Sequence, residues 1–177
     1  MRWRRVILAA LMVLALVATG AAALAAAPGL AAIGGPSKPL GPVTKTSGCR
    51  VRVHGTLPDR GCTPGAVFTE ATRARVCRRG YTKTVRHVTE ATKDRVYRSY
   101  GIRHRRPYEY EVDHLVALEL GGSNARSNLW PEAYAGRRGA RRKDVIENDL
   151  HSRICSGRMS LRRAQRLTAG DWRRVGH

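Results

Sequence analysis

The chain has 177 residues, of which 33 are basic and 13 acidic, and its formal net charge is +20 at pH 7. A chain of this length buries one hydrophobic core, which excludes an enzyme built from two large domains. The positive charge favours polyanionic partners, because a field of this sign attracts them and speeds their capture.

The N-terminal segment has the pattern of an export signal. Three arginines lie within the first five residues, and no further charge occurs before Lys38. The dense apolar part, Val6–Val17, is shorter than a membrane span, and the small residues after it suit cleavage. We therefore predict that residues 1–27 are a signal peptide. The alternative is an N-terminal membrane anchor, because Ala21–Ala27 extends the apolar run. Either alternative predicts a secreted or extracytoplasmic protein, membrane-anchored in the second case.

The rest of the chain divides into a linker and one domain. Residues 28–48 are rich in Gly, Pro, Ala and Ser, which predicts a flexible linker before a folded domain over residues 49–177. The four cysteines of this domain include no CxxC pair, a pattern typical of disulfides in an exported protein rather than of a zinc site. Three pairings are possible. We favour a local bridge, Cys49–Cys62, and a long-range bridge, Cys77–Cys155.

A strand, a long loop, a second strand and a helix are expected in the middle of this domain. Residues 108–116 contain strand-forming side chains, Gly121-Gly122 signals a turn, and residues 127–130 can return as a second strand. Residues 140–154 predict a helix, because apolar side chains recur there at a spacing of four. With further short helices on either side, these elements indicate an α+β fold.

Asp113-His114, at the end of the first expected strand, is the pair best suited to chemistry. An unperturbed imidazole has a pKa near ~6.5, so His114 can take a proton from water at neutral pH. Asp113 can hold a divalent ion, which offsets the negative charge that builds up when a phosphodiester is attacked. Adjacent strand residues point to opposite faces, so the pair must lie where the strand gives way to the loop. Asn128 could bridge loop and strand and hold the imidazole still.

The motifs around this pair resemble those of the secreted HNH endonuclease family. They are Asp113-His114, Gly121-Gly122-Ser123-Asn124, Asn128-Leu129-Trp130-Pro131 and Lys143-Asp144-x-x-Glu147. The similarity extends from about Thr63 to Trp172. It implies a small ββα-metal core stabilised by disulfides. It also implies that His114 is the general base, Asp113 a metal ligand and Asn128 the middle residue of the HNH signature.

The helix is expected to supply the second protein ligand of the metal. Many HNH nucleases have Asn or His there, whereas this chain has Gly139-Ala140 near the helix start. The remaining candidates are His151 and Glu147, which are four residues apart and therefore on one helical face. His151 is the better match to the final histidine of the signature; Glu147 can substitute, or can pair with Lys143 instead. Such a site suits Mg²⁺ or Mn²⁺, with Zn²⁺ as an alternative.

A basic run leads into the expected helix. The side chains that we predict to grip phosphates are Arg137, Arg138, Arg141, Arg142 and Lys143. Phosphate contacts carry no base specificity and weaken with salt, so little sequence preference is expected.

Together these features predict a monomeric, metal-dependent endonuclease that hydrolyses DNA, with RNA as a second substrate class and without a small-molecule cofactor. Two alternatives remain. One is a non-catalytic basic protein of the cell envelope that binds polyanions. The other is a secreted nuclease toxin, which uses the same chemistry but requires an immunity partner.

Overall fold

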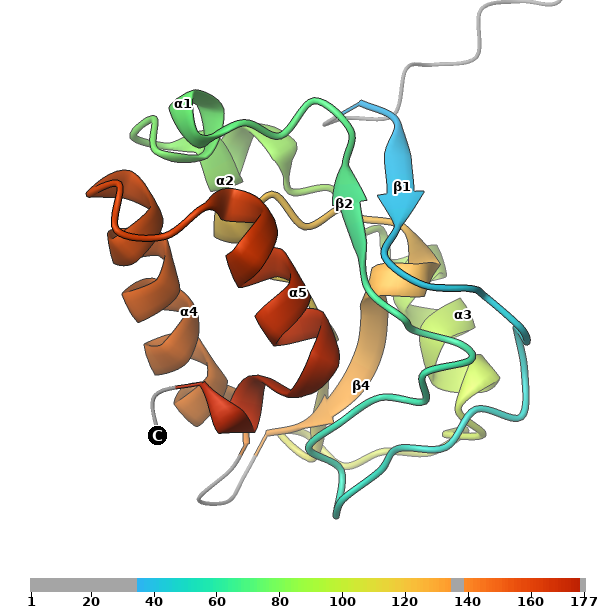
Figure 1. Cartoon of the computed structure of the whole chain (residues 1–177). Coiled ribbons are helices and arrows are strands. Elements are labelled where there is room, and N and C mark those ends of the chain that lie inside the picture. Colours follow the sequence, from blue (N-terminus) through green and yellow to red (C-terminus); the bar gives the residue numbers. More distant parts are fainter. Residues whose placement is uncertain (1–34, 135–138, 176–177) are drawn as a thin grey trace, which may run out of the picture. The chain divides into compact units, whose positions relative to one another are not determined.

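The structure, a computed structural model, describes residues 35–134 and 139–175 (Figure 1). Contacts divide the chain into residues 1–30 and residues 31–177, and the described residues belong to the second unit. The predicted leader over residues 1–27 lies outside the described part. The elements, in chain order, are β1 (Ser37–Pro39), β2 (Ala66–Phe68), α1 (Arg73–Val76), α2 (Tyr81–Val85), α3 (Glu90–Ser99), β3 (Tyr110–His114), η1 (Leu118–Leu120), η2 (Arg126–Asn128), β4 (Leu129–Ala133), α4 (Ala140–Cys155), α5 (Leu161–Asp171) and η3 (Trp172–Arg174).

The described residues form two antiparallel sheets of two strands each, surrounded by helices, so the α+β prediction is confirmed. β1 pairs with β2, and β3 pairs with β4 in a register that places Asp113 opposite Trp130 and His114 opposite Leu129. Figure 1 shows β4 between α3 on one side and α4 and α5 on the other. The β3–β4 hairpin and α4 follow the predicted order of strand, loop, strand and helix.

β1 lies inside the segment that the sequence predicts to be a linker. Its residues pair with β2, and just after it the N–H of Leu40 donates to the carbonyl of Gly65 at 2.8 Å. The folded part therefore begins before Cys49, and the predicted boundary is wrong. The composition gave no sign of this, because backbone hydrogen bonds attach β1 while all three of its side chains are exposed.

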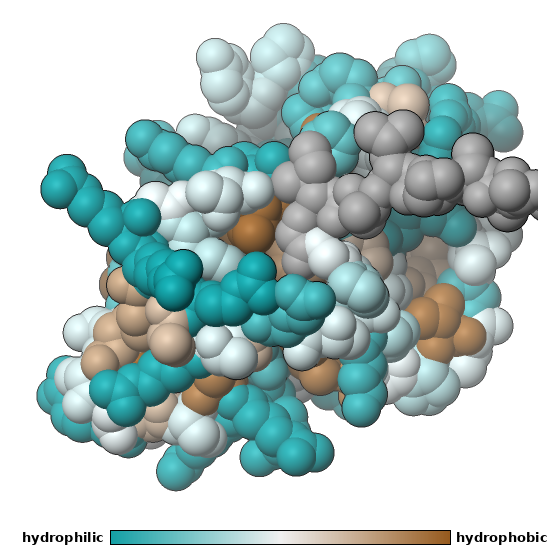
Figure 2. Space-filling view, turned by 90° about the horizontal axis from the view of Figure 1, so that it is seen from above, coloured by the Kyte–Doolittle hydropathy of each residue, from teal (hydrophilic) through white to brown (hydrophobic). Residues whose placement is uncertain are grey.

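The core fixes α4 against the rest of the domain. Its apolar stripe, Ile146, Leu150 and Ile154, is buried, as the spacing of four predicts. Trp172 closes the core near the C-terminal end, where its indole N–H donates to the carbonyl of Thr56 at 3.1 Å. Figure 2, a view from above, shows mostly hydrophilic side chains on that face, with small apolar patches.

Both predicted disulfides are present. Cys49–Cys62 closes a local loop, with Cα atoms 6.0 Å apart. Cys77–Cys155 joins the residue that follows α1 to the last residue of α4, with Cα atoms 5.6 Å apart. Such bonds are compatible with an extracellular location. Over residues 35–134 and 139–175, the structure contains no helix with the length and apolarity needed to cross a bilayer.

Candidate functional site

A cavity of about 300 Å³ opens where the end of β3, the loop after it and α4 meet. Its polar and charged lining includes Arg86, Asp113, His114, Glu119, Asp144, Glu147 and Asn148. Four of these side chains are carboxylic acids, in a protein whose formal charge is +20. Asp113, His114 and Glu147, which the sequence predicted to lie together, do line one cavity. The sequence did not identify Glu119 or Arg86 as neighbours, because they come from other elements, whereas Asp144 lies three residues before Glu147 on α4.

His114 is the last residue of β3, and the backbone leaves the strand immediately after it. The N–H of Leu115 still donates to the carbonyl of Asn128 at 2.7 Å, but the chain then turns into η1. The predicted position of the Asp113-His114 pair, at the transition from strand to loop, is therefore confirmed. The imidazole itself is mostly buried, with His114 only 4% exposed.

Asn124 holds the imidazole of His114 in one orientation. Its Nδ2 donates to the carbonyl of Val85 at 2.7 Å, while its Oδ1 accepts from the backbone N–H of His87 at 3.3 Å, so the amide orientation is fixed. The same Oδ1 lies 3.1 Å from Nε2 of His114. An oxygen can only accept here, so in the neutral ring the proton is on Nε2 and the lone pair is on Nδ1.

The environment of His114 keeps its ring neutral. Burial lowers the pKa of His114, and the nearby cations of Lys143 and Arg86 lower it further, against the opposing effects of Asp113 and Asn124. A neutral imidazole with its lone pair on a defined nitrogen is the form that accepts a proton from water.

The prediction that Asn128 holds the imidazole is wrong, because its side chain is fully committed to the backbone. Its Oδ1 accepts from the N–H groups of Ala66 at 3.2 Å and Val116 at 2.9 Å. Its Nδ2 donates to the carbonyls of Val116 at 3.0 Å and Ser123 at 2.8 Å. Asn128 thus bridges the loop and the strands, as expected, and shapes the segment that carries Asn124.

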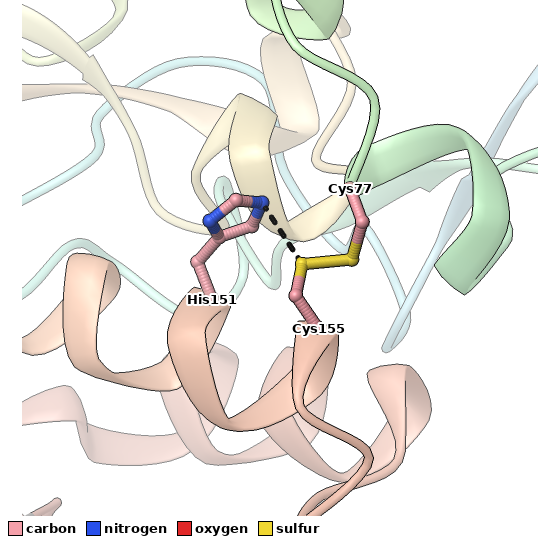
Figure 3. A group of neighbouring side chains, drawn as sticks. All are labelled: Cys77, His151 and Cys155. Carbon is pink, nitrogen blue, oxygen red and sulfur yellow. Dashed lines mark hydrogen bonds between the residues drawn. A yellow bond between two sulfur atoms is a disulfide. The ribbon is translucent and has the colours of Figure 1, made fainter.

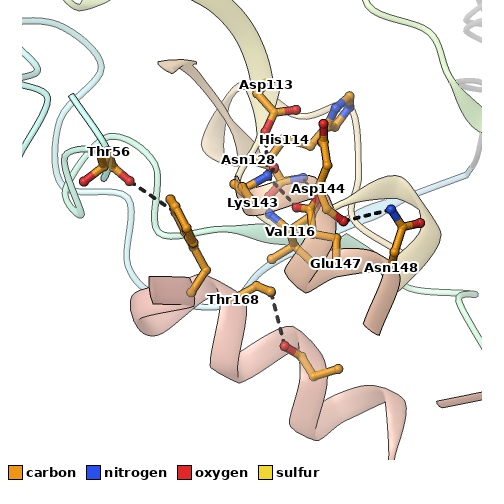
Figure 4. A network of polar contacts seen from close by, with 12 residues as sticks. Thr56, Asp113, His114, Val116, Asn128, Lys143, Asp144, Glu147, Asn148 and Thr168 are labelled. Carbon is orange, nitrogen blue, oxygen red and sulfur yellow. Dashed lines mark hydrogen bonds and ion pairs between the residues drawn. The ribbon is translucent and has the colours of Figure 1, made fainter. Parts of the chain in front are cut away.

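Lys143 is not a surface residue that grips phosphates, contrary to the prediction. It is fully buried, and its Nζ donates to Oδ2 of Asp113 and Oε1 of Glu147, each at 2.5 Å, and to the carbonyl of His114 at 2.8 Å (Figure 4). Its three N–H groups are therefore all used inside the protein. The helix turn between Lys143 and Glu147 places both on the face of α4 that meets β3.

This buried ammonium sets the charge state of the carboxyls around it. Burial raises the pKa of Asp113, but Lys143, a hydrogen bond from Glu132 and the neighbouring charges together lower it to about 2. Burial alone would lower the pKa of Lys143, yet the surrounding carboxylates raise it well above its usual value. Burial raises the pKa of Glu147 to about 8, despite the opposing effect of Lys143. Asp113 and Lys143 are consequently charged at neutral pH.

Glu132 is a member of this cluster that the sequence did not suggest. It is fully buried on β4, and no donor among the described residues reaches either of its carboxyl oxygens. The acceptor beside it is the Asp113 carboxylate, so a hydrogen bond forms only when Glu132 carries the proton. Burial raises the pKa of Glu132 to about 10, which keeps it protonated at neutral pH and able to donate to Asp113. The sequence pattern of β4 could not predict that Glu132 is a buried acid that keeps its proton.

His151 does not line the cavity that holds Asp113. Its Nε2 lies 3.1 Å from the carbonyl oxygen of Val76 and 3.5 Å from Sγ of Cys155, beside the disulfide to Cys77 (Figure 3). Of the two helix candidates, the structure therefore brings Glu147 to the cavity.

Cys77, His151 and Cys155 form a group that could hold a metal ion, whose identity the geometry leaves open. Within the described residues, this is the one trio of His, Cys, Asp or Glu ligand atoms that all lie within 4.8 Å of one another. The two sulfurs are joined as a disulfide, however, and metals are bound by the thiolate form of cysteine. The trio is therefore a metal site only after reduction.

The five residues of the predicted basic run differ in their surroundings. Arg137 and Arg138 lie outside the described residues, Arg141 and Arg142 are exposed on the first turn of α4, and Lys143 is buried. The guanidinium of Arg141 lies 5.9 Å from the centre of the Tyr134 ring. Among the described residues, the arginine that lines the His114 cavity is Arg86, which directly follows α2.

Four carboxyl groups line the cavity, although within the described residues no three of them bring ligand atoms within 4.8 Å of one another. The candidate ligands of the cavity are carboxylate oxygens, which Mg²⁺ and Mn²⁺ prefer, and Asp113 and Glu147 both contact one ammonium. Burial is the largest factor that raises the pKa values of Glu119, Asp144 and Glu147, and neighbouring carboxylates raise them further. Crowded acids of this kind are relieved by a bound cation.

No protein-family model, curated protein or solved structure matches the chain.

Proposed function

We propose that the protein is a metal-dependent endonuclease that hydrolyses phosphodiester bonds of DNA with low sequence specificity. One observation carries the proposal: an acid-lined cavity beside a neutral, oriented histidine, in a protein that is otherwise strongly basic. The basic surface suits a polyanion, whereas the acidic cavity would repel one unless a cation were bound there. The resemblance to HNH endonucleases points to the same chemistry.

His114 acts as the general base. Its Nδ1 takes a proton from a water molecule as the water oxygen forms a bond to phosphorus, and Asn124 holds Nε2–H throughout. The bond from phosphorus to O3′ breaks and the leaving oxygen takes a proton from solvent, which gives a 5′-phosphate and a 3′-hydroxyl. The resemblance to the HNH family, rather than the geometry, assigns these two ends.

Asp113 would hold the divalent ion, and Glu147, whose pKa is raised to about 8, would join it on losing its proton. When bound, the ion neutralises the charge that develops on the phosphoryl oxygens and the leaving oxygen. Lys143 and Glu132 act through Asp113: the ammonium fixes its Oδ2, and the protonated acid donates to the same carboxylate. Both contacts keep Asp113 ionised and oriented, as a ligand must be.

Arg86 is the cation best placed to bind the scissile phosphate. It lines the cavity with His114, it is exposed, and its charge acts on the imidazole. A guanidinium offers paired N–H donors that match two phosphate oxygens. Its presence also disfavours protonation of His114, which supports the role of His114 as a base.

The test is degradation of supercoiled plasmid by the full chain, with disulfides formed, in Mg²⁺, in Mn²⁺ and in EDTA. We expect activity with either metal, none in EDTA, and a loss of about 10²- to 10⁴-fold on His114→Ala and His114→Gln, the usual contribution of a general base. His54→Asn is the matched control, because His54 is exposed and has a φ of 54°, which Asn tolerates. Circular dichroism verifies that each variant is folded.

The same experiment separates the alternatives. A non-catalytic polyanion binder would retain DNA affinity and show no cleavage under any condition. Cleavage that survives both EDTA and the His114 substitutions would overturn the assignment of the site. A toxin would cleave as the nuclease does and would be distinguished by an immunity partner that inhibits it.

A further inference from the structure

The His114 cavity continues into two further hollows. A hollow of about 430 Å³ shares Arg86 and His114 with the cavity. A third, of about 460 Å³, shares Tyr97 and Arg105 with the second. The shared lining residues place the three hollows next to one another, in an order that runs from His114 along α3 to the segment after it. We call the second and third hollows the α3 track.

The α3 track is basic, whereas the cavity at its end is acidic. Its cationic lining consists of Arg86, Lys93, Arg98, Arg103 and Arg105. Over residues 35–134 and 139–175, none of the four arginines has a carboxylate within ion-pair distance. Their charges are therefore available to a ligand.

Three acids also line the track, and one of them is offset by an ion pair. Glu90 pairs with Lys93 at 2.7 Å. Burial, with the nearby Asp113 and Asp144, raises the pKa of Glu111. Asp94 is the third, so unpaired positive charge predominates along the track.

Arg105 is held by an aromatic ring at the junction of the two hollows. Its guanidinium carbon lies 4.0 Å from the centre of the Tyr97 ring, which is itself buried. Stacking of this kind occupies the face of the guanidinium and leaves its N–H edge free for a phosphate. A long side chain that is already oriented loses less entropy when it binds.

We propose that a nucleic-acid strand leaves the His114 cavity along the α3 track, where Arg98, Arg103 and Arg105 bind the phosphates on one side of the cut. This inference rests on the proposed function, because it takes the cavity as the place of cleavage. The main phosphate contacts are then on the α3 track and not on the basic run predicted at the start of α4, where Lys143 is buried. Binding is accordingly asymmetric about the scissile bond.

The test measures binding without cleavage. A fluorescently labelled oligonucleotide, single-stranded or duplex, is titrated with the His114→Gln protein in EDTA and read by anisotropy at several salt concentrations. The track variant carries Arg98→Gln, Arg103→Gln and Arg105→Gln. The control variant carries Arg158→Gln, Arg162→Gln and Arg163→Gln, which are also exposed and remove the same charge.

We expect the track variant to lose about tenfold or more in affinity and its salt slope to fall by about 2 to 3, since each phosphate contact contributes about 0.7 to 0.9. The control variant should lose about twofold, because only the long-range field changes. Equal losses in the two variants, or a larger loss on Arg141→Gln with Arg142→Gln, would refute the track.

The plasmid assay tests the proposed function independently of the α3 track. If the wild-type chain does not cleave but the track variant alone loses affinity, the nuclease assignment is wrong and the binding surface stands. If the chain cleaves with His114 and metal as proposed but the track variant binds normally, the nuclease assignment stands and the track is wrong.

Discussion

Replacing Glu132 with Gln should stabilise the metal-free protein, and the gain should increase with pH. The folded protein keeps Glu132 protonated, with a pKa of about 10, whereas the unfolded chain ionises it near the ordinary value of 4.5. Between these two values the folded state binds the extra proton, so the free energy of unfolding falls as pH rises. Gln resembles the protonated acid in shape and can still donate a hydrogen bond to Asp113, but it cannot ionise in the unfolded chain.

The magnitude follows from the width of this window. Each pH unit removes up to about 1.4 kcal/mol of unfolding free energy from the wild type, or about 3 kcal/mol between pH 4.5 and pH 7. Urea unfolding in EDTA at pH 5, 6, 7 and 8 should therefore show a gap between Glu132→Gln and wild type that widens steadily. Glu70→Gln is the control, because that side chain is 59% exposed and should give no such slope. Parallel stability curves for Glu132→Gln and wild type would refute a buried neutral acid.

Two further predictions concern stability. Replacing both cysteines of the Cys77–Cys155 bridge with serine should lower the free energy of unfolding by about 4.5 kcal/mol, and the same change at Cys49–Cys62 by about 3 kcal/mol, because the sequence separations are 78 and 13. Urea unfolding of the oxidised proteins measures both losses. Equal losses, or a larger loss at Cys49–Cys62, would contradict the loop-entropy explanation. Gly122→Ala should cost about 3 kcal/mol or prevent folding, since a Cβ there would lie 1.7 Å from the carbonyl oxygen of Val116. Gly170→Ala, in α5 with no atom within 4 Å of the new Cβ, should instead stabilise the protein by about 0.5 to 1 kcal/mol, and thermal unfolding of the two variants with the same sign of change would disprove this contrast.

The sequence by itself determined the features that depend on local pattern. The spacing of four among Ile146, Leu150 and Ile154 predicted a helix over residues 140–154, and α4 begins at the predicted residue and ends one residue later. The Asp113-His114 pair was placed at a strand end because adjacent strand residues point apart, and β3 does end at His114. The favoured cysteine pairing was also correct. The helix and the strand end needed only short-range geometry, and the export context predicted disulfides, whereas their pairing was one of three possibilities.

The tertiary structure alone decided which groups meet. Asn128 was the predicted partner of His114, but the backbone groups of Ala66, Val116 and Ser123 occupy its side chain, and Asn124 contacts the imidazole instead. No pattern distinguishes two amides so close in the chain, because their partners come from segments that are distant in sequence.

The tertiary structure also decided which charged side chains are buried and which acid keeps its proton. A lysine in a run of arginines indicates a solvated surface, yet Lys143 lies between Asp113 and Glu147 because α4 turns that face toward β3. The neutral state of Glu132 follows from its contact with Asp113 across the β3–β4 sheet and from the absence of solvent there. Desolvation acts on a group through everything packed around it, so its effect on a pKa becomes visible only when the elements are assembled.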